Sequence, residues 1–452
     1  QGVLEELPSR NVVSWSTLIA GYAQNGQALE AVRCLERMRK EGISPNEITF
    51  ACILKACGSM GVIEKGKEIH DEIVGRGLLQ KSIVLGNALV DMYAKCGVLE
   101  KALQVLEELP SRNVASWNAL ISGYAQHEKG HDALNCYTRM QREGFSPNEI
   151  TFSSILNACG KIGAIGKGKQ IHDEIVCRGL LEKNIVLGNA LVNMYAKCGL
   201  LSKARQVLQE LPSRNVASWS ALITGYTQHE QGHEALNCFS QMQREGTPPN
   251  EITFLCILKA CGSIGAIDKG KQIHGDIVNR GLLKKHIVLG NALVDMYATC
   301  GDLTRAQKVF EELPIRDIVS WSALIAGYAQ HGHVNEVVDM LEKMEREDGL
   351  SPNDVTFLSI LSGCSRSGRV DEAQTYYESM STKYGITPNL EHHTCMVGVL
   401  GCSDEAMVMI KSMPVSFKEY PSCWLTFLGA CKKWGNLRLA LLAFDEMMML
   451  RD

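Results

Sequence analysis

Two histidines open a short pattern that begins a metal site in some enzymes. His70 and His172 each start the sequence H-D-E, which matches the H-x-E half of the signature of zinc-dependent deaminases. The other half, P-C-x-x-C, does not occur in the sequence, and a third copy at His274 reads H-G-D. The pattern therefore belongs to a repeated segment, and we predict no catalytic residues from it.

Cysteine is the other residue type that could do chemistry, because the chain contains 17. His392, His393, Cys395 and Cys402 are close enough in sequence to consider a zinc site, but C-x-x-C is absent, so we predict packing positions and no metal. Nine other cysteines recur at intervals of 102 residues, which predicts small buried side chains, free thiols and a reducing compartment. They are Cys34, Cys136 and Cys238, then Cys57, Cys159 and Cys261, then Cys96, Cys198 and Cys300.

Composition excludes several other classes of protein. The sequence has no Walker or GxGxxG phosphate loop and no G-x-S-x-G elbow, so no cofactor is expected. No stretch approaches the ~20 apolar residues of a membrane span. With 46 Lys+Arg against 50 Asp+Glu, the net charge of −4 argues against nucleic acid held mainly by one large basic surface.

The elements that must position any site are repeats. Trp15, Trp117, Trp219 and Trp321 are spaced by 102 residues, each inside W-[SN]-[TA]-L-I, which predicts a stack of small units with a shared core. Triplets of 35, 36 and 31 residues fill 12–113, 114–215 and 216–317, a diverged triplet fills 318–420, and a last segment fills 421–452. Residues 1–11 match only the end of a 31-residue repeat, and Gln1 stands where Met is expected, so we expect a piece of a longer protein.

Each repeat has the spacing of two helices. Within 12–46, apolar residues from Trp15 to Tyr22 fall three and four apart, and a second stripe runs from Ala28 to Met38. No segment alternates with period two for long enough to predict a strand. Because a single hairpin cannot bury both stripes, we predict an all-α solenoid of tandem helix-turn-helix repeats.

The repeat lengths identify the closest family. Tetratricopeptide repeats are a uniform 34 residues, whereas these alternate. The segments SWNALISGYAQHEKGHDALNCYTRMQREGFSPN, GKQIHDEIVCRGL and VLGNALVNMYAKCG resemble the pentatricopeptide repeat family, in its P, L and S subclass, over nearly the whole chain. The resemblance implies that the first, second and third repeats of each triplet are P, L and S repeats. The closing segment, from LEHHTCMVGVLG to WLTFLGACKKWGNL, is similar to a final S repeat and E motif. That last S repeat lacks three residues, which we expect to be missing at the turn between its helices. The resemblance also implies that the solenoid is a right-handed superhelix.

The resemblance implies binding of single-stranded RNA with one base per repeat. In the family, the fifth and last residues of a repeat read the base edge, and the second residues of successive repeats clamp the base. The matching pairs here are Ser16 with Asn46, Asn87 with Asn113, Asn118 with Asn148, Asn189 with Asn215, Ser220 with Asn250, Asn291 with Asp317, and Ser322 with Asn353, and Thr394 is the fifth residue of the last S repeat. The clamping residues are Val13, Val84, Ala115, Val186, Ala217, Val288 and Val319, with Ile48, Ile150, Ile252 and Val355 at the same place in L repeats.

Both sets have a purely structural interpretation as well. Asn, Ser and Asp commonly cap helices, and apolar second residues could belong to the core. The fifth residues, however, lie inside the predicted first helix and vary between Ser and Asn, which favours a code. The L repeats carry pairs that are mostly unsuited to base readout, so we expect L repeats to be spacers. The pairs are Ala51 with Ser82, Ser153 with Asn184, Leu255 with His286, and Leu358 with Asn389.

In the family, Ser or Thr with Asn favours adenine, Asn with Asp favours uracil, and Asn with Asn favours pyrimidines. With the N-terminal repeats toward the 5′ end, the resemblance implies the target 5′-AnYYnYAnUAn-3′. Thr394, as the fifth residue of the last S repeat, implies a purine at the next position of the target. Tyr420, the last residue of that repeat, is not a usual partner for a fifth residue. Lys95 and Lys197 follow a base-reading Asn by two helical turns on the same face, so they are candidate phosphate contacts, with solvated lysines as the alternative.

The order of P, L and S repeats with an E-like ending is similar to plant specificity factors for organellar C-to-U RNA editing. In those proteins a deaminase domain follows the E segments or is recruited in trans, so we expect this segment to select a cytidine without deaminating it. Expected partners are single-stranded organellar RNA, accessory editing factors and a deaminase in trans, in the mitochondrion or chloroplast, with no membrane and no small-molecule substrate. An organellar RNA stability or splicing factor and a peptide-binding helical scaffold are the alternatives.

Overall fold

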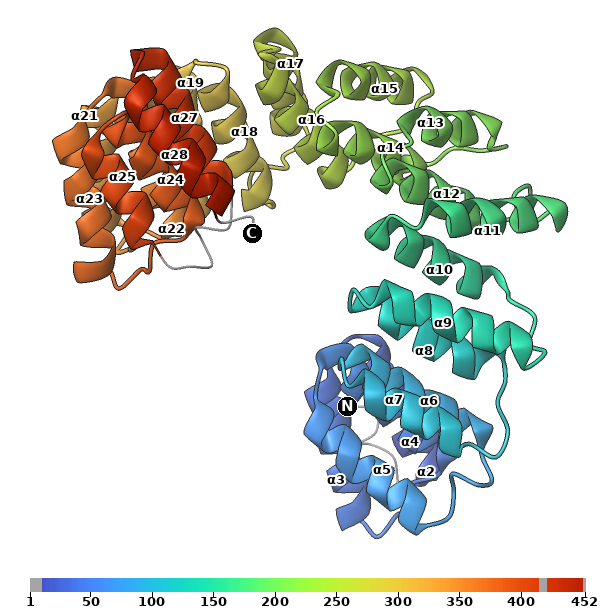
Figure 1. The fold of residues 1–452 in the computed structure, drawn as a ribbon. Helices are drawn as coiled ribbons and strands as arrows, with labels where there is room; N and C mark the ends of the chain where they lie inside the picture. The colour runs from blue at the N-terminus through green and yellow to red at the C-terminus, as the bar shows by residue number, and fades with distance from the viewer. Residues whose placement is uncertain (1–9, 414–420, 450–452) are drawn as a thin grey trace. The chain divides into compact units, whose positions relative to one another are not determined.

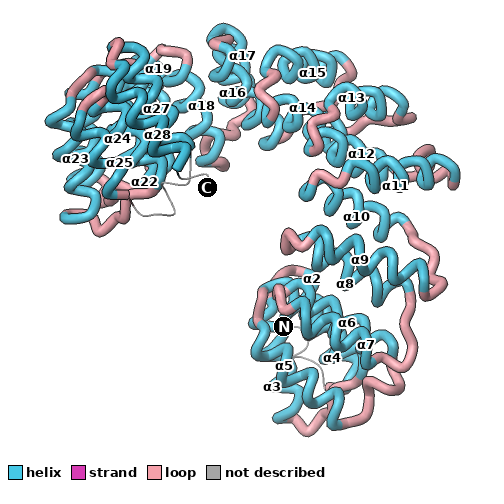
Figure 2. The backbone as a smooth tube through the Cα atoms, in the orientation of Figure 1, coloured by secondary structure: helices cyan, strands magenta, loops and turns pink. Residues whose placement is uncertain are grey.

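The computed structural model describes residues 10–413 and 421–449 of the chain. All regular secondary structure in those residues is helical, with 26 α-helices and no strand (Figures 1 and 2). The predicted all-α repeat fold is therefore confirmed. None of the helices in the described ranges is long and apolar enough to cross a membrane. Most of the predicted N-terminal tail, Tyr420 and the last three residues of the E-like segment lie outside the described residues.

The chain divides into two compact halves, residues 1–225 and 226–452, and each is a row of helical hairpins. In the N-terminal half, the first helices of the hairpins are α2 (Val12–Gln24), α4 (Glu47–Met60), α6 (Ile83–Lys95), α8 (Val114–Gln126), α10 (Glu149–Ile162), α12 (Ile185–Lys197) and α14 (Val216–Gln228), which ends in the other half. Their second helices are α3 (Ala28–Lys40), α5 (Ile63–Gly75), α7 (Leu99–Glu108), α9 (Gly130–Arg142), α11 (Ile165–Cys177) and α13 (Leu201–Glu210).

The C-terminal half continues the same alternation. Its first helices are α16 (Glu251–Ile264), α18 (Ile287–Thr299), α20 (Ile318–Gln330), α22 (Asp354–Ser367), α24 (Leu390–Leu400) and α27 (Pro421–Trp434). Its second helices are α15 (Gly232–Arg244), α17 (Ile267–Asn279), α19 (Leu303–Glu311), α21 (Val334–Glu347), α23 (Val370–Thr382), α25 (Asp404–Ser412) and α28 (Leu437–Met449).

The core of each half runs along the row of first helices. A first helix packs against its own second helix and against the first helix of the following repeat, as α4 does with α6 and α6 with α8. Trp15 and Ile19 on the predicted stripe of α2 are fully buried, and so are Ala31 and Leu35 on the stripe of α3. Each hairpin thus completes its core with a neighbour, which is the reason the repeats occur in tandem.

The glycine of the L-I-x-G-Y motif lets successive first helices approach closely. A Cβ atom added to Gly123 on α8 would lie 2.5 Å from the Cβ of Ala94 on α6, and the copy at Gly225 would lie 2.6 Å from the Cβ of Ala196. Real Cβ atoms do not come so close, so any larger residue would push the two helices apart. The motif is therefore a packing requirement of the stack.

The cysteines follow the predicted repeat closely. The sets at Cys34 and Cys57, with their copies, are buried, and all 17 cysteines are free thiols. Burial raises the pKa of the Cys57 thiol to about 11 and that of Cys261 to about 12, so both stay protonated. The third set is only half-buried, and the Cys96 thiol lies 3.8 Å from the carbonyl oxygen of Cys57, to which it donates. The packing interpretation is confirmed for the two buried sets.

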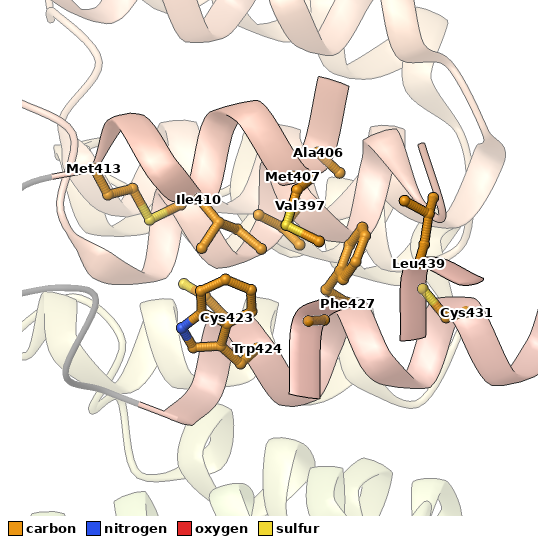
Figure 3. Packing of buried hydrophobic residues seen from close by; sticks show 11 residues of the cluster. Val397, Ala406, Met407, Ile410, Met413, Cys423, Trp424, Phe427, Cys431 and Leu439 are labelled. Atoms are coloured by element: carbon orange, nitrogen blue, oxygen red, sulfur yellow. The ribbon is translucent and has the colours of Figure 1, made fainter. Parts of the chain in front are cut away.

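The last S repeat corrects one prediction. The turns 96–98 and 401–403 contain three residues each, so the deletion does not lie in the turn. Helix α24 has 11 residues and α25 has 9, against 13 in α6 and 10 in α7, so the helices themselves are shorter. Reversing the chain needs a minimum connection, whereas a helix can lose residues at its end. Val397, Ile410 and Phe427 still join α24, α25 and α27 in one apolar cluster (Figure 3).

Candidate nucleic-acid interface

In residues 12–353, the last residue of each P and S repeat is the N-cap of the next first helix. The side chain of Asn113 accepts a hydrogen bond from the backbone N–H of Ser116, and the Ser116 side chain accepts one from the N–H of Asn113. This reciprocal capping box recurs at the other caps, and at Asn215 the Oδ1 atom accepts from Ser218 N at 3.0 Å. The recurrences are at Asn46, Asn148, Asn250, Asp317 and Asn353. The cap interpretation is therefore correct for the last residues.

The fifth residues occupy a different place, one turn inside the first helix. Ser16, Asn118, Ser220, Asn291 and Ser322 are buried, with 5–7% of their surface exposed. Asn87 and Asn189 are half-buried. Because these side chains lie past the first three residues of the helix, they cap nothing, in agreement with the sequence prediction.

The structure brings fifth and last residues together as pairs. In four repeats the Nδ2 atom of the fifth residue donates to the capping Oδ1 of the last residue. The distances are 3.3 Å for Asn87 to Asn113, 3.0 Å for Asn118 to Asn148, 3.3 Å for Asn189 to Asn215 and 3.1 Å for Asn291 to Asp317. Ser16 Oγ donates to Asn46 Oδ1 over a longer 3.4 Å, and Ser322 lies 3.0 Å from the Thr356 hydroxyl that also contacts Asn353. Ser220 and Asn250 belong to different halves of the chain.

This pairing determines which atom of each cap stays available. A backbone N–H needs an acceptor, so the capping atom of Asn113 or Asn148 must be its oxygen, and the amide Nδ2 of the same side chain is left as a donor. At Asp317 the corresponding atom is a second carboxylate oxygen, which accepts. Two otherwise identical positions therefore present opposite hydrogen-bonding groups.

Three of the four L repeats lack this pair. Ala51, Leu255 and Leu358 occupy their fifth position, and none of them has a polar side-chain atom, whereas the second L repeat has Ser153 with Asn184. Their last residues are used locally, since Ser82 caps α6 and contacts Glu47, and the His286 ring lies 2.9 Å from the Glu251 carboxylate. The fifth position is thus apolar in three L repeats where a P or S repeat is polar, and Ser153 makes the second L repeat the exception.

The candidate clamping residues, at the second position of the repeats, are apolar and exposed in both halves of the chain. Their exposed fractions run from 50% at Val288 to 65% at Val13, and Ala115 and Ala217 are exposed too. The alternative that these residues belong to the core is therefore wrong. Side chains that face solvent in every repeat are not needed for packing, so they are available to contact a ligand.

Two hollows in the N-terminal half are lined by these sets of residues together. One of about 490 Å³ is bounded by Asn87, Ala115, Asn118, Asn148 and Ile150, among others. The other, of about 410 Å³, includes Val186, Asn189 and Ala217 in its lining. Base-reading and clamping candidates from consecutive repeats therefore share one surface.

The two lysine candidates differ in their surroundings. Lys95 forms an ion pair with Asp91 at 2.7 Å, whereas the residue equivalent to Asp91 beside Lys197 is the neutral Asn193. Burial lowers the pKa of Lys197, and the nearby Lys161 lowers it further. Asp91 lines the larger hollow and Asn193 lines the smaller one. The charge at this position of the lining therefore differs between the first and second triplets.

The histidines of the H-x-E pattern, and the third copy His274, pack against tyrosines of the following helix. His70 Nδ1 lies 2.9 Å from the Tyr93 hydroxyl, and the copies His172 with Tyr195 and His274 with Tyr297 are 3.0 Å apart. Burial lowers the pKa of all three histidines, so they are neutral near pH 7. Sequence reasoning missed this contact, although a tyrosine 23 residues after each histidine is the signal that could have revealed it.

His392, His393 and Thr394 make hydrogen bonds within the fold. His392 Nε2 is 2.9 Å from the Asp354 carbonyl oxygen, and His393 Nδ1 is 2.8 Å from the Tyr377 hydroxyl. The Thr394 hydroxyl donates to the Leu390 carbonyl oxygen at 2.8 Å, within its own helix. Across residues 10–413 and 421–449, no group of three or more His, Cys, Asp or Glu side chains is arranged to hold a metal ion.

Fold and site together define a tandem helical-hairpin protein with a repeated polar pair on one surface. The PPR repeat family model matches residues 10–59, 112–161, 214–263 and 316–366. A second model, for the PPR repeat, matches 87–114, 150–180, 189–216, 291–318, 355–384 and 422–451.

Relatives from Arabidopsis thaliana are similar in sequence to nearly the whole chain. A chloroplastic pentatricopeptide repeat-containing protein is 36% identical over 451 residues, which cover 99% of this chain and 55% of the relative. Another pentatricopeptide repeat-containing protein is 32% identical over 450 residues, covering 99% of this chain and 79% of the relative. The chain belongs to the pentatricopeptide repeat family. It spans about half the length of the first curated relatives that it matches.

Solved structures of the same family are more distant. Crystal structures of the pentatricopeptide repeat protein PPR10 align with 98% of this chain. The structure from maize has 18% identity and a TM-score of 0.37, and covers 79% of that chain. The structure in complex with an 18-nt psaJ RNA element has 16% identity and a TM-score of 0.40, and covers 85% of that chain.

Proposed function

We propose that this chain is a sequence-specific single-stranded RNA-binding protein that reads one base per P or S repeat. The observation that carries the proposal is the fifth-residue and N-cap pair, repeated beside an exposed apolar second residue. Hydrogen-bonding groups held in fixed orientation suit the edge of a base, and apolar side chains on either side suit its two faces.

The chemistry of the pairs supports different bases. A cap Asn offers an Nδ2 donor, which complements the ring-nitrogen acceptor of adenine or cytosine. Asp317 offers an acceptor, which complements the N–H of uracil. The length of the fifth side chain separates sizes of base, because Ser16 leaves room for a purine whereas Asn87 fills that space and favours a pyrimidine. The resulting target is 5′-AnYYnYAnUAn-3′, with the L repeats as spacers.

We further propose that the protein belongs to the P, L and S subclass and is a specificity factor for organellar C-to-U editing, with a deaminase domain in cis or in trans. The repeat lengths and the E-like segment support this. The chloroplastic relative supports an organellar location. An organellar RNA stability factor would share the binding chemistry, and it differs in that the predicted target would not lie upstream of an edited cytidine.

A single base change tests the binding mode. The affinity of the chain for the predicted RNA is compared with that for the same RNA carrying G in place of the U that faces Asn291 and Asp317. We expect a loss of about 5-fold to 100-fold, the cost of one mismatched contact. Equal affinities would refute the code, and preferential binding of peptides over RNA would favour a protein-binding scaffold.

A further inference from the structure

The third residue of the repeat that follows each base-reading pair carries a hydroxyl group. It is always Ser or Thr, at Thr49, Ser116, Thr151, Ser218, Thr253, Ser320 and Thr356. The residue at the same place after an L repeat is Leu85, Leu187, Leu289 or His392. Because the first helices α6 and α12 begin on a side-chain cap without this hydroxyl, helix initiation alone does not require it.

The contacts of the hydroxyl reach both members of the pair. Thr151 Oγ1 lies 2.6 Å from Asn118 Oδ1 and 3.1 Å from Asn148 Oδ1, while the amide of Asn118 donates to the same Asn148 oxygen. The three side chains form a closed triangle. In the first repeat, Thr49 Oγ1 lies 2.7 Å from Ser16 Oγ and 2.8 Å from Asn46 Oδ1 in the same arrangement.

Serine at this position takes two arrangements. Ser116 Oγ donates to Asn87 Oδ1 at 2.6 Å, whereas Ser218 Oγ donates to the Asn215 carbonyl oxygen at 2.8 Å. Among the described residues, Asn189 Oδ1 beside Ser218 is then buried without a hydrogen-bond partner. An unpaired buried oxygen is costly, so the direction of this hydroxyl decides whether the fifth residue can accept a bond from another group.

We infer that the third-residue hydroxyl of the following repeat is a positioning group for base recognition. It holds the fifth side chain and the cap in one mutual orientation, and thereby selects which of their atoms face the base. This inference rests on the proposed RNA-binding function. Threonine keeps the hydroxyl on the fifth residue because its β-branch restricts χ1, and serine allows it to turn away.

The test compares Thr151→Val, which keeps the shape and removes the hydroxyl, with Thr151→Ser, which restores it. For each protein, affinity is measured for two RNAs that carry a pyrimidine or a purine opposite Asn118 and Asn148. We expect the pyrimidine preference of Thr151→Val to fall on the order of tenfold, the value of about one hydrogen bond, and that of Thr151→Ser to stay near the wild-type value. In an Asn118→Ala background, Thr151→Val should change the preference no further.

Ser82→Ala is the matched control, because it removes a capping hydroxyl at an L-repeat junction with Ala51 in the fifth position. It should weaken the start of α6 and leave every base preference unchanged. If Thr151→Val lowers the affinity for both RNAs equally, or retains the wild-type preference, the positioning role is refuted. If the wild-type chain itself has no base preference, the proposed function fails instead.

Discussion

The junctions after P and S repeats and the junctions after L repeats are built on the same backbone and differ in chemistry. After a P or S repeat, a buried fifth side chain donates to a helix cap, as Asn118 does to Asn148. In the L repeat 251–286 the apolar Leu255 stands in the fifth position, and a polar contact lies instead on its second helix, where His274 Nδ1 is 3.0 Å from the Tyr297 hydroxyl. The same backbone therefore carries a polar pair or an apolar contact according to a few side chains per repeat.

The RNA itself gives the largest expected contrast between the two junctions. Changing the pyrimidine that faces Asn118 and Asn148 to a purine should weaken binding by about 5-fold to 100-fold. Changing the nucleotide that faces Leu255 and His286 should have an effect of less than about twofold, because no hydrogen-bonding pair is present there. Competition binding with the two altered RNAs measures both values. Equal losses of affinity at the two positions would contradict the difference between the two kinds of junction.

Changing one fifth residue should redirect a polar junction. In Asn291→Thr, the shorter side chain leaves room for a purine while Asp317 still offers an acceptor, so the preference should move from U to G by about tenfold. Selection from an RNA pool randomised at this position provides the measurement. Retention of U would mean that the fifth residue does not set the size of the base. Val288→Ala, at the exposed clamping position of the same repeat, should weaken binding without changing the preferred base.

Helix stability distinguishes a capping box from an N-cap that makes no side-chain hydrogen bond. Asn148→Ala removes a capping box, so the first turn of α10 should lose about 1 kcal/mol. His286→Ala should cost α18 much less, because His286 makes no side-chain cap bond. Amide hydrogen exchange in the two first turns reports each value locally. Similar loss of protection in both helices would contradict the expected difference between the Asn148 and His286 caps.

The buried His70 and His172 of the L repeats predict that the stability of the fold depends on pH. Burial, followed by Lys203, lowers the pKa of His172, while Asp173 and Glu210 oppose the shift. The unfolded chain therefore binds a proton first, so stability is steady above about pH 6.5 and falls as the pH drops toward the lower folded pKa. His172→Phe should remove part of that decline in thermal unfolding, whereas substitution of the exposed His131 should not. If the loss of stability at low pH were the same in His172→Phe, it would be caused by groups other than His172.

The smallest expected effect is electrostatic. Lys197→Gln should reduce the slope of log affinity against log salt by about 0.7, the value of one phosphate contact on a single strand. Lys95→Gln should reduce it less, because Asp91 already neutralises Lys95. Titrations at several salt concentrations give both slopes. A wild-type slope equal to about eight or more contacts would contradict binding through many base-specific contacts.

The periodic spacing of apolar residues predicted much of this architecture, because the faces of a helix are determined by spacing along the sequence. The tryptophan spacing and the stripe from Trp15 to Ile19 predicted buried faces of helices, and the repeated cysteines predicted buried small residues. Periodicity could not say whether Val13 belongs to the core or to the surface, since an apolar residue near a helix start suits both. It also placed the deletion of the last S repeat in a turn, whereas shortened helices absorb it.

The sequence by itself determined the all-α class and the tandem repetition, because hydrophobic periodicity and repeats depend on spacing along one chain. The resemblance to the family, and not spacing alone, pointed to the paired Asn, Ser and Asp residues. Tertiary structure alone decided that those residues are partners. Asn118 and Asn148 are 30 positions apart, and their 3.0 Å hydrogen bond exists only because successive first helices pack side by side. The exposure of the second residues and the link through Thr151 have the same origin, since each depends on how one repeat stacks on the next.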